Sequence, residues 1–318
     1  MYPRIVFRHA CLPACRLSID LTRSLRECAD VRGVLSASEW HPMKVTSIKT
    51  PMIGRAAFGA ALCIVATAPA VADTVRIGGT GMALAAMQFA GEGLAATQRD
   101  ISTKVLPSLG TPGGLKALAQ GAIDLAVIGR PLNADEKAKE LVDAGCTTTA
   151  LLFATSHPRP HGITTAQLPG IYADERPSWP DGRPLKIILR SRAGSENAYL
   201  TAAIPGMAAA LEAAYQRRGI PVATTDQENA EQASRIAGSF AIMTMLQMRA
   251  EKLELRPVAL DSVLPSAETV ADKTYPLSVS VCLVLPARPK PAAEKFITYL
   301  KSGAGRTLLM SLGATPLR

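Results

Sequence analysis

The chain has 318 residues, of which 48% are hydrophobic, 19% are charged and only 4% are aromatic. This length suffices for one large globular unit or for two lobes. The low aromatic content does not indicate an aromatic-rich surface for carbohydrate or nucleic acid. The formal net charge of +9 by itself favours a nucleic-acid partner. A chain that starts at Asp73, however, has 26 basic and 22 acidic residues, a net charge of +4, and we expect no nucleic-acid partner for it.

Residues 43–72 have the three parts of a secretory signal peptide. A basic beginning is followed by an uncharged apolar stretch at 56–67 and by the small-x-small site Ala70-Val71-Ala72. The apolar stretch is too short to span a membrane comfortably. We therefore predict a periplasmic protein that is cleaved after Ala72.

Residues 1–42 precede this signal and carry no periodic pattern, so they are predicted to be a leader or a mis-assigned start, with Met43 as the functional start. They contain three of the six cysteines, but not the four-ligand spacing of a zinc knuckle. Only Cys146 and Cys282 follow the cleavage site. In an exported protein they can form a disulfide, or they can remain as two buried thiols.

Strands and helices alternate from residue 74 onward. The expected strands are 74–79, 102–110, 123–129 and 146–154. The expected helices are 82–96, 113–121 and the charged segment 134–145, the last two ended by glycines. This alternation predicts a mostly parallel sheet that is covered by helices on both faces.

A proline-rich connector at 156–162 interrupts the pattern. His157 and His161 have the i,i+4 spacing of metal ligands on a helix, but the intervening prolines exclude a regular helix, so no metal site is expected. A second unit follows, with expected helices at 164–173, 196–204 and 207–218 and strands at 184–190 and 238–245. A second connector at 250–262 leads to a strand at 275–286 and to helices at 290–302 and 304–312.

Three glycine-rich junctions each follow an expected strand and open an expected helix, at 78–82, 110–114 and 192–197. Free backbone N–H groups and the helix dipole favour a bound anion at such a junction. Each junction also contributes a hydroxyl group, from Thr80, Thr111 and Ser195. In the ordinary alternative Ser195 is an N-cap and Thr111 precedes a proline at the first helical position.

Two arginines end strands next to these junctions. Arg130 follows the strand 123–129, and Arg190 ends the strand 184–190. A guanidinium at such a place can bind an oxyanion through two parallel hydrogen bonds. The sequence therefore predicts a site for a small oxyanion.

Catalytic signatures are missing from the sequence. It contains no G-x-S-x-G, H-E-x-x-H or Cys/His motif, and the only histidines after residue 72 lie in the connector at 156–162. We expect no enzyme, no catalytic residue and no cofactor, although a Ser–Lys arrangement stays open.

An ordered set of stretches between 74 and 318 resembles the phosphate-binding periplasmic proteins of ABC transporters. The stretches are GGTGM, GTPGGLKALAQGAIDLAVIGRPLNADE, ITTAQLPGIYADERPSW, IILRSRAGSEN, RIAGSFAIMTM and VLPSAETVADKTYPLSVSVCLVLP. The resemblance implies the type II periplasmic-binding-protein fold: two α/β lobes with mixed, mostly parallel sheets, helices on both faces and a ligand cleft between the lobes. It places the first lobe at 73–157 and 258–318 and the second at 158–257.

The same resemblance implies a function. The chain would be an exported solute-binding protein that captures a small oxyanion, phosphate by default, and delivers it to the membrane permease of an ABC importer. It would act as a monomer. The ligand-binding positions carried over from the family are Thr80, Gly81, Met82, Thr111, Arg130, Arg190, Ser195, Glu196 and Asn197.

Two positions depart from the family pattern. Gly129 stands where the family often has an aspartate that accepts a hydrogen bond from protonated phosphate, and Glu196 replaces a glycine at the third junction. The spacing leaves open whether Arg190 or Arg192 faces the cleft. These departures keep an alternative in view, namely a periplasmic sensor or assembly component that has lost phosphate binding; a periplasmic hydrolase is disfavoured.

Glu196 itself has two interpretations. Its carboxylate can cap the helix or pair with Arg190, Arg192 or Arg130, which would weaken phosphate binding. It can instead point to solvent, as acidic residues in the first turn of a helix often do.

Overall fold

The computed structural model describes residues 72–318, which belong to one compact unit. The predicted signal peptide, its cleavage site and the three upstream cysteines lie outside the described residues, except for Ala72 itself. Within 72–318 no helix has both the length and the apolar character that crossing a membrane requires.

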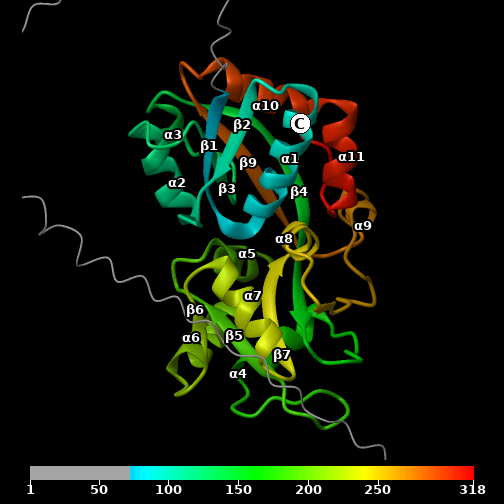
Figure 1. The fold of residues 1–318 in the computed structure, drawn as a ribbon. Coiled ribbons are helices and arrows are strands. Elements are labelled where there is room, and N and C mark those ends of the chain that lie inside the picture. The colour runs from blue at the N-terminus through cyan, green and yellow to red at the C-terminus, as the bar shows by residue number, and fades with distance from the viewer. Residues whose placement is uncertain (1–71) are drawn as a thin grey trace, which may run out of the picture. The chain divides into compact units, whose positions relative to one another are not determined.

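The first half of the sheet combines strands from the beginning of the described chain with one strand from near its end. β1 (Asp73–Gly79) pairs in parallel with β2 (Ile101–Val105) and with β3 (Leu125–Ile128). β9 (Ser278–Pro286) then runs antiparallel to β3 and to the long strand β4 (Leu141–Thr155). The helices of this half are η1 (Gly81–Ala83), α1 (Leu84–Thr97), α2 (Gly110–Ala119), α3 (Ala134–Lys137), α10 (Pro291–Lys301) and α11 (Gly303–Ser311) (Figure 1).

β4 continues into the second half of the sheet. Its last residues pair with β7 (Ser239–Thr244) and β8 (Arg256–Pro257), and β7 pairs in parallel with β5 (Lys186–Arg190), which in turn pairs with β6 (Val222–Ala223). The helices of this half are η2 (Thr165–Gln167), α4 (Leu168–Ala173), α5 (Ser195–Ala203), α6 (Met207–Gln216) and α7 (Asp226–Arg235). α8 (Met245–Ala250) and α9 (Ala267–Ala271) follow β7 and β8 along the chain. The fold is therefore two-lobed, with β4 common to both halves of the strand order β2-β1-β3-β9-β4-β7-β5-β6.

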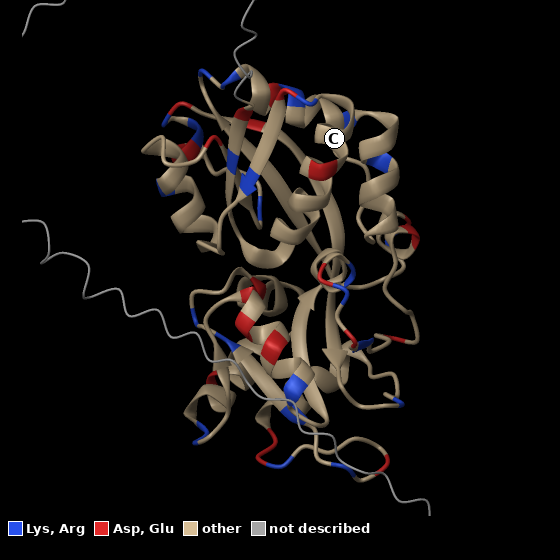
Figure 2. Ribbon diagram, viewed as in Figure 1, with Lys and Arg blue, Asp and Glu red and all other residues tan. Residues whose placement is uncertain are grey.

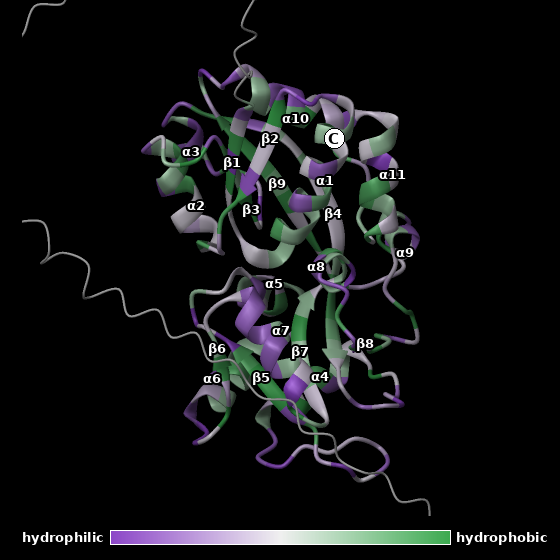
Figure 3. Ribbon diagram, viewed as in Figure 1, coloured by the Kyte–Doolittle hydropathy of each residue, from purple (hydrophilic) through white to green (hydrophobic). Residues whose placement is uncertain are grey.

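Apolar strands hold each lobe together. β3, β5, β7 and β9 are strongly hydrophobic, whereas α7 is hydrophilic along most of its length (Figure 3). In the second half of the sheet Phe153 and Phe240 stack with ring centroids 4.5 Å apart, and Trp179 meets Phe240 edge to face. Burial of such rings contributes the largest share of core stability per residue.

The prediction of a helix over 134–145 is wrong. α3 ends at Lys137, and β4 begins at Leu141. Glu140 adopts a positive φ of 58°, which ends any helical run, and the following residues pair with β9. The helices α7, α8 and α9 were not predicted, although Thr225 and Ser266 are N-caps of α7 and α9.

Cys146 and Cys282 form a disulfide. They lie directly opposite each other on β4 and β9, with Cα atoms 4.0 Å apart. The disulfide alternative is therefore confirmed over two free thiols.

Candidate functional site

The first junction is a tight turn between β1 and η1. Gly79 has φ of 136°, and a β-carbon placed on it would lie 1.9 Å from the carbonyl oxygen of Val127, so only glycine fits there. The N–H of Thr80 donates to that same carbonyl at 2.8 Å. The turn thereby fixes Thr80, Gly81 and Met82 at the beginning of the helix.

The second junction and the end of β3 are tied to each other. The backbone N–H of Gly129 donates to Oγ1 of Thr111 at 3.0 Å, a buried hydrogen bond. Gly114 packs against Cα of Gly79, which a β-carbon on Gly114 would approach to 2.7 Å. The first two junctions therefore form one packed surface on the first lobe.

The third junction meets that surface from the second lobe. A β-carbon placed on Gly129 would lie 3.2 Å from Oγ of Ser195 and 3.4 Å from Sδ of Met82, while Tyr199 on α5 donates to the Gly129 carbonyl at 2.9 Å. A β-carbon at position 129 would be in tight contact with Ser195 and in ordinary contact with Met82, so a side chain there would require a small shift of Ser195. Glycine at this position thus fits the close approach of the two lobes.

Met82 and Thr244 add to the contact between the lobes. Oγ1 of Thr244 donates to the carbonyl of Met82 at 2.9 Å. The Met82 side chain is only 2% exposed and packs within the hydrophobic cluster of the second lobe, together with residues of β5 and β7. Its methionine side chain therefore occupies space at the boundary that a smaller residue would leave open.

Arg190 is the arginine that faces the site, and it is held by two carboxylates. Its Nε donates to Oε1 of Glu196 at 3.1 Å, and its Nη2 donates to Oδ1 of Asp226 at 3.0 Å. Its Nη1 donates to the backbone carbonyl of Thr225. All three ionisable side chains are at most 7% exposed. We call this set, Arg190, Glu196 and Asp226, the buried triad.

The buried triad reaches the first junction. A β-carbon placed on Gly81 would lie 2.6 Å from Oδ2 of Asp226, and the side chain of Gln227 donates to the Gly81 carbonyl at 3.3 Å. A carboxylate of the chain itself therefore lies against the glycine that opens the first helix, where the sequence predicted a bound anion. Figure 2 shows the acidic positions along α7.

The surroundings of Asp226 raise the pKa of its carboxyl group. Burial raises this pKa and Glu196 raises it further, while Arg190 lowers it. One guanidinium cannot neutralise two buried carboxylates, so a proton on Asp226 brings the triad to electrical neutrality.

The other arginines near the junctions are paired elsewhere. Arg130 forms two hydrogen bonds of 2.7 Å with the carboxylate of Glu136, which lowers the pKa of Glu136 to about 2. Arg192 pairs with Glu212 on the exposed surface and lies over the ring of Tyr215. Asn197 donates to the Ser191 carbonyl and to Tyr215, so it supports the third junction from within the second lobe.

These contacts decide two open points of the sequence analysis. The buried arginine beside the junctions is Arg190, not Arg192, and the Glu196 side chain is buried against Arg190 instead of pointing to solvent. The ligand-binding role of the nine predicted positions stays a prediction. Asp226 was not predicted as a site residue, although Thr225-x-x-Glu228 is a sequence signal for the start of a helix and Thr225 does accept from the Glu228 N–H.

His157 is buried, whereas His161 is exposed. Nε2 of His157 lies 3.0 Å from Oδ2 of Asp181, and its ring packs on Trp179 with centroids 5.1 Å apart. Among residues 72–318 no three histidine, cysteine or acidic side chains gather in a way that could hold a metal ion.

Comparisons with known proteins agree with the two-lobed fold. Residues 65–303 match the model of a PBP superfamily domain. A putative phosphate ABC transporter substrate-binding protein from Clostridium perfringens, solved with bound phosphate, superposes with a TM-score of 0.64 at 16% identity, covering 77% of this chain and 100% of its own. An ABC-type phosphate transport receptor from Vibrio cholerae gives 0.51 at 15% identity, covering 76% and 99%. No curated protein sequence matches the chain significantly.

Proposed function

Since the chain belongs to the PBP superfamily, we propose that it is an exported solute-binding protein that captures a small oxyanion and delivers it to the permease of an ABC importer. One observation carries the proposal. The three strand–loop–helix junctions converge on Gly129: its N–H donates to Thr111, and a β-carbon placed on it would lie 3.2 Å from Oγ of Ser195 and 3.4 Å from Sδ of Met82. Helix N-termini and hydroxyl groups gathered in this way suit an oxyanion. Phosphate is the first ligand to test, because the Clostridium perfringens protein holds it on a similar fold.

The proposal includes the division of the chain. Residues 43–72 serve as the signal peptide, and the mature protein starts at Asp73 in the periplasm. The first lobe comprises 73–157 and 258–318, and the second comprises 158–257. The Cys146–Cys282 disulfide supports export, because structural disulfides persist in oxidising compartments. N-terminal sequencing of protein from the cell envelope tests the cleavage site.

A second candidate rests on the buried triad. Arg190 already has two carboxylate partners within the chain, and an incoming phosphate would have to compete with both of them. This observation favours a periplasmic sensor or assembly component that kept the fold and lost phosphate binding.

A titration panel separates the two candidates. Phosphate, sulfate and small carboxylates are titrated into the purified protein by calorimetry and in thermal-shift assays. A ligand at 100 times its dissociation constant should stabilise the folded protein by roughly 2.7 kcal/mol. Stabilisation by an oxyanion supports the receptor. If no oxyanion acts on the native chain but phosphate binds once Glu196 and Asp226 are neutralised, the second candidate replaces it.

A further inference from the structure

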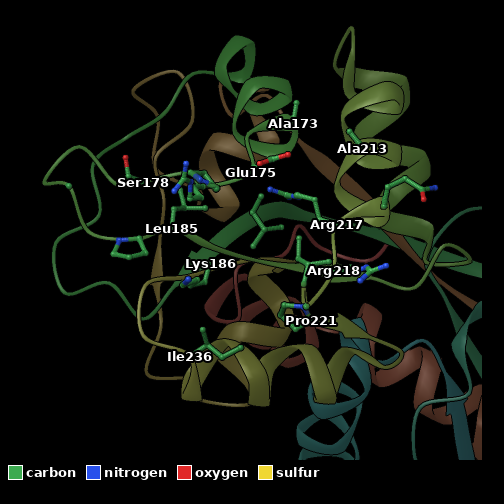
Figure 4. A pocket seen from close by; sticks show the side chains of 18 residues that line it. Ala173, Glu175, Ser178, Leu185, Lys186, Ala213, Arg217, Arg218, Pro221 and Ile236 are labelled. Carbon is green, nitrogen blue, oxygen red and sulfur yellow. The ribbon is translucent and has the colours of Figure 1, made fainter.

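A recess on the second lobe lies apart from the junctions. It has a volume of about 1170 Å³ and is bounded by the ends of α4 and α6, by the beginning of β5 and by residues 175–184 (Figure 4). This volume slightly exceeds the range of about 300–1,000 Å³ that is typical of small-molecule sites. None of the nine predicted ligand positions lines it.

An arginine with unsatisfied donors lines this recess. Arg217 follows α6 as its C-cap, and its Nη1 donates to the carbonyl of Asp174 at the end of α4. Its Nε and Nη2 are buried and have no hydrogen-bond partner among the described residues. Buried donors without partners are unfavourable and rare in folded proteins. An oxyanion seated beside Arg217 would satisfy them after a small rotation of the side chain.

The charge of the recess also favours an anion. Four cationic side chains line it, against the single carboxylate of Glu175. Unlike Arg130, Arg190 and Arg192, none of the four forms an ion pair with a described carboxylate. They are Arg176, Lys186, Arg217 and Arg218.

Part of the remaining wall is apolar. It includes the buried side chains of Leu185 and Ile187 together with Ile220, Pro221 and Ile236. An apolar wall contributes affinity in proportion to the apolar area that a ligand covers. The combination selects a molecule with one charged end and one apolar end over a fully hydrated inorganic ion.

We propose that this recess, which we call the lobe 2 pocket, binds an organic anion that carries a carboxylate or phosphate head on a short apolar chain. The head pairs with Arg217 and Lys186, and the apolar chain lies along Leu185 and Ile220. This site is separate from the oxyanion site between the lobes and does not depend on it.

Four probes test the lobe 2 pocket on the purified protein: octanoate, octyl phosphate, octanol and inorganic phosphate, each titrated by calorimetry. We expect saturable binding of octanoate or octyl phosphate, with the stronger of the two identifying the head group. Octanol, which has the same chain without the charge, should bind at least tenfold more weakly. Inorganic phosphate should leave this site unoccupied.

Variants then place the binding in the recess. Arg217→Met should weaken binding of the preferred probe at least tenfold. Because that change also removes the hydrogen bond to the Asp174 carbonyl, Ala213→Trp is the second variant: Ala213 is exposed and lines the recess, so a bulky side chain there blocks the pocket and leaves Arg217 in place. Arg235→Gln, a cation of the same lobe that pairs with Glu231 outside the recess, is the matched control and should bind normally.

Several results would overturn the proposal. These are no saturable binding of either charged probe, equal binding of octanoate and octanol, or binding that Ala213→Trp leaves unchanged in a folded variant. Glu196→Gly should not alter octanoate binding. If octanoate binds to a protein that does not bind inorganic phosphate, the lobe 2 pocket is independent of the proposed oxyanion site.

Discussion

Arg190 and Glu196 are six residues apart in sequence and form a buried ion pair, with 3.1 Å between Nε and Oε1. Arg190 ends β5, and Glu196 lies in the first turn of α5. The glutamate thus pairs with the arginine that the family resemblance assigned to ligand binding. Asp226, from a third element, completes the triad.

Removal of the Glu196 carboxylate should strengthen phosphate binding. Glu196→Gly and Glu196→Gln both relieve the competition for Arg190, and Asp226 still keeps the guanidinium from being buried without a partner. We expect phosphate affinity to rise by one order of magnitude or more, about 1.4 kcal/mol, in calorimetric titration. Glu212→Gln, which removes the exposed partner of Arg192, is the control and should have no effect. Unchanged affinity in both Glu196 variants would mean that Glu196 plays no part in ligand choice.

Asp226 should make the stability of the protein depend on pH between about 4 and 7. Its pKa is raised to about 7 in the folded protein, against roughly 3.9 in the unfolded chain, so the folded state binds the proton more tightly. The stability that this proton contributes is present below the unfolded pKa and is lost as the pH rises through the folded pKa. Asp226→Asn lacks this titration.

The measurement is the Tm of both proteins from pH 5 to pH 8. Wild-type Tm should fall relative to that of Asp226→Asn across this range. Glu251, whose pKa burial also raises, titrates in both proteins, and its charge is one of the causes that raise the pKa of Asp226. Asp124 and Glu136 have lowered pKa values of about 2. The stability that their ionised carboxylates contribute is therefore lost only at more acidic pH. Parallel Tm curves would show that Asp226 is not protonated in the folded protein.

The disulfide should contribute substantially to stability. It joins residues 136 positions apart in sequence, and closing a long loop restricts the unfolded chain strongly. Cys146→Ser together with Cys282→Ser should lower the free energy of unfolding by about 2–5 kcal/mol, measured by denaturant titration. A thiol assay on the denatured chain that starts at Asp73 should find no free thiol before reduction. Two free thiols there would contradict the bond.

Gly79 should tolerate no side chain. Gly79→Ala places a β-carbon 1.9 Å from the Val127 carbonyl, whereas Gly121→Ala places one with nothing within 4 Å, although both glycines have positive φ. Gly121→Ala therefore measures the cost of a β-carbon in the left-handed region without a steric clash, about 1–2 kcal/mol. Gly79→Ala should cost clearly more and should displace Thr80. Equal thermal shifts for the two variants would exclude a steric requirement at the first junction.

Much of the fold could be predicted from local patterns. The glycine-terminated strands and the apolar run of β9 have clear periodicity, and their positions agree with the structure to within a few residues. The helix predicted over 134–145 failed because its charged residues favour a helix locally, while pairing of β4 with β9, 136 residues away at the cysteines, determines the strand. Sequence spacing carries no information on that pairing.

The candidate site was predictable only in part. The three junctions follow from glycines and hydroxyls at strand ends, which are local features. The partner of Arg190 is not local: Asp226 lies 36 residues away on a polar helix, and only the tertiary fold brings it to β5. The direction of Glu196 was likewise undecided, because a residue in the first turn of a helix can face either the core or solvent.

Calorimetric titration of phosphate, with sulfate and small carboxylates in parallel, into the purified wild-type protein decides whether the chain binds an oxyanion. We expect saturable binding of an oxyanion at one site per chain, with a phosphate affinity that Glu196→Gly increases at least tenfold. If no oxyanion gives heat of binding or thermal stabilisation, either with the wild-type protein or with Glu196→Gly, the chain is not an oxyanion receptor.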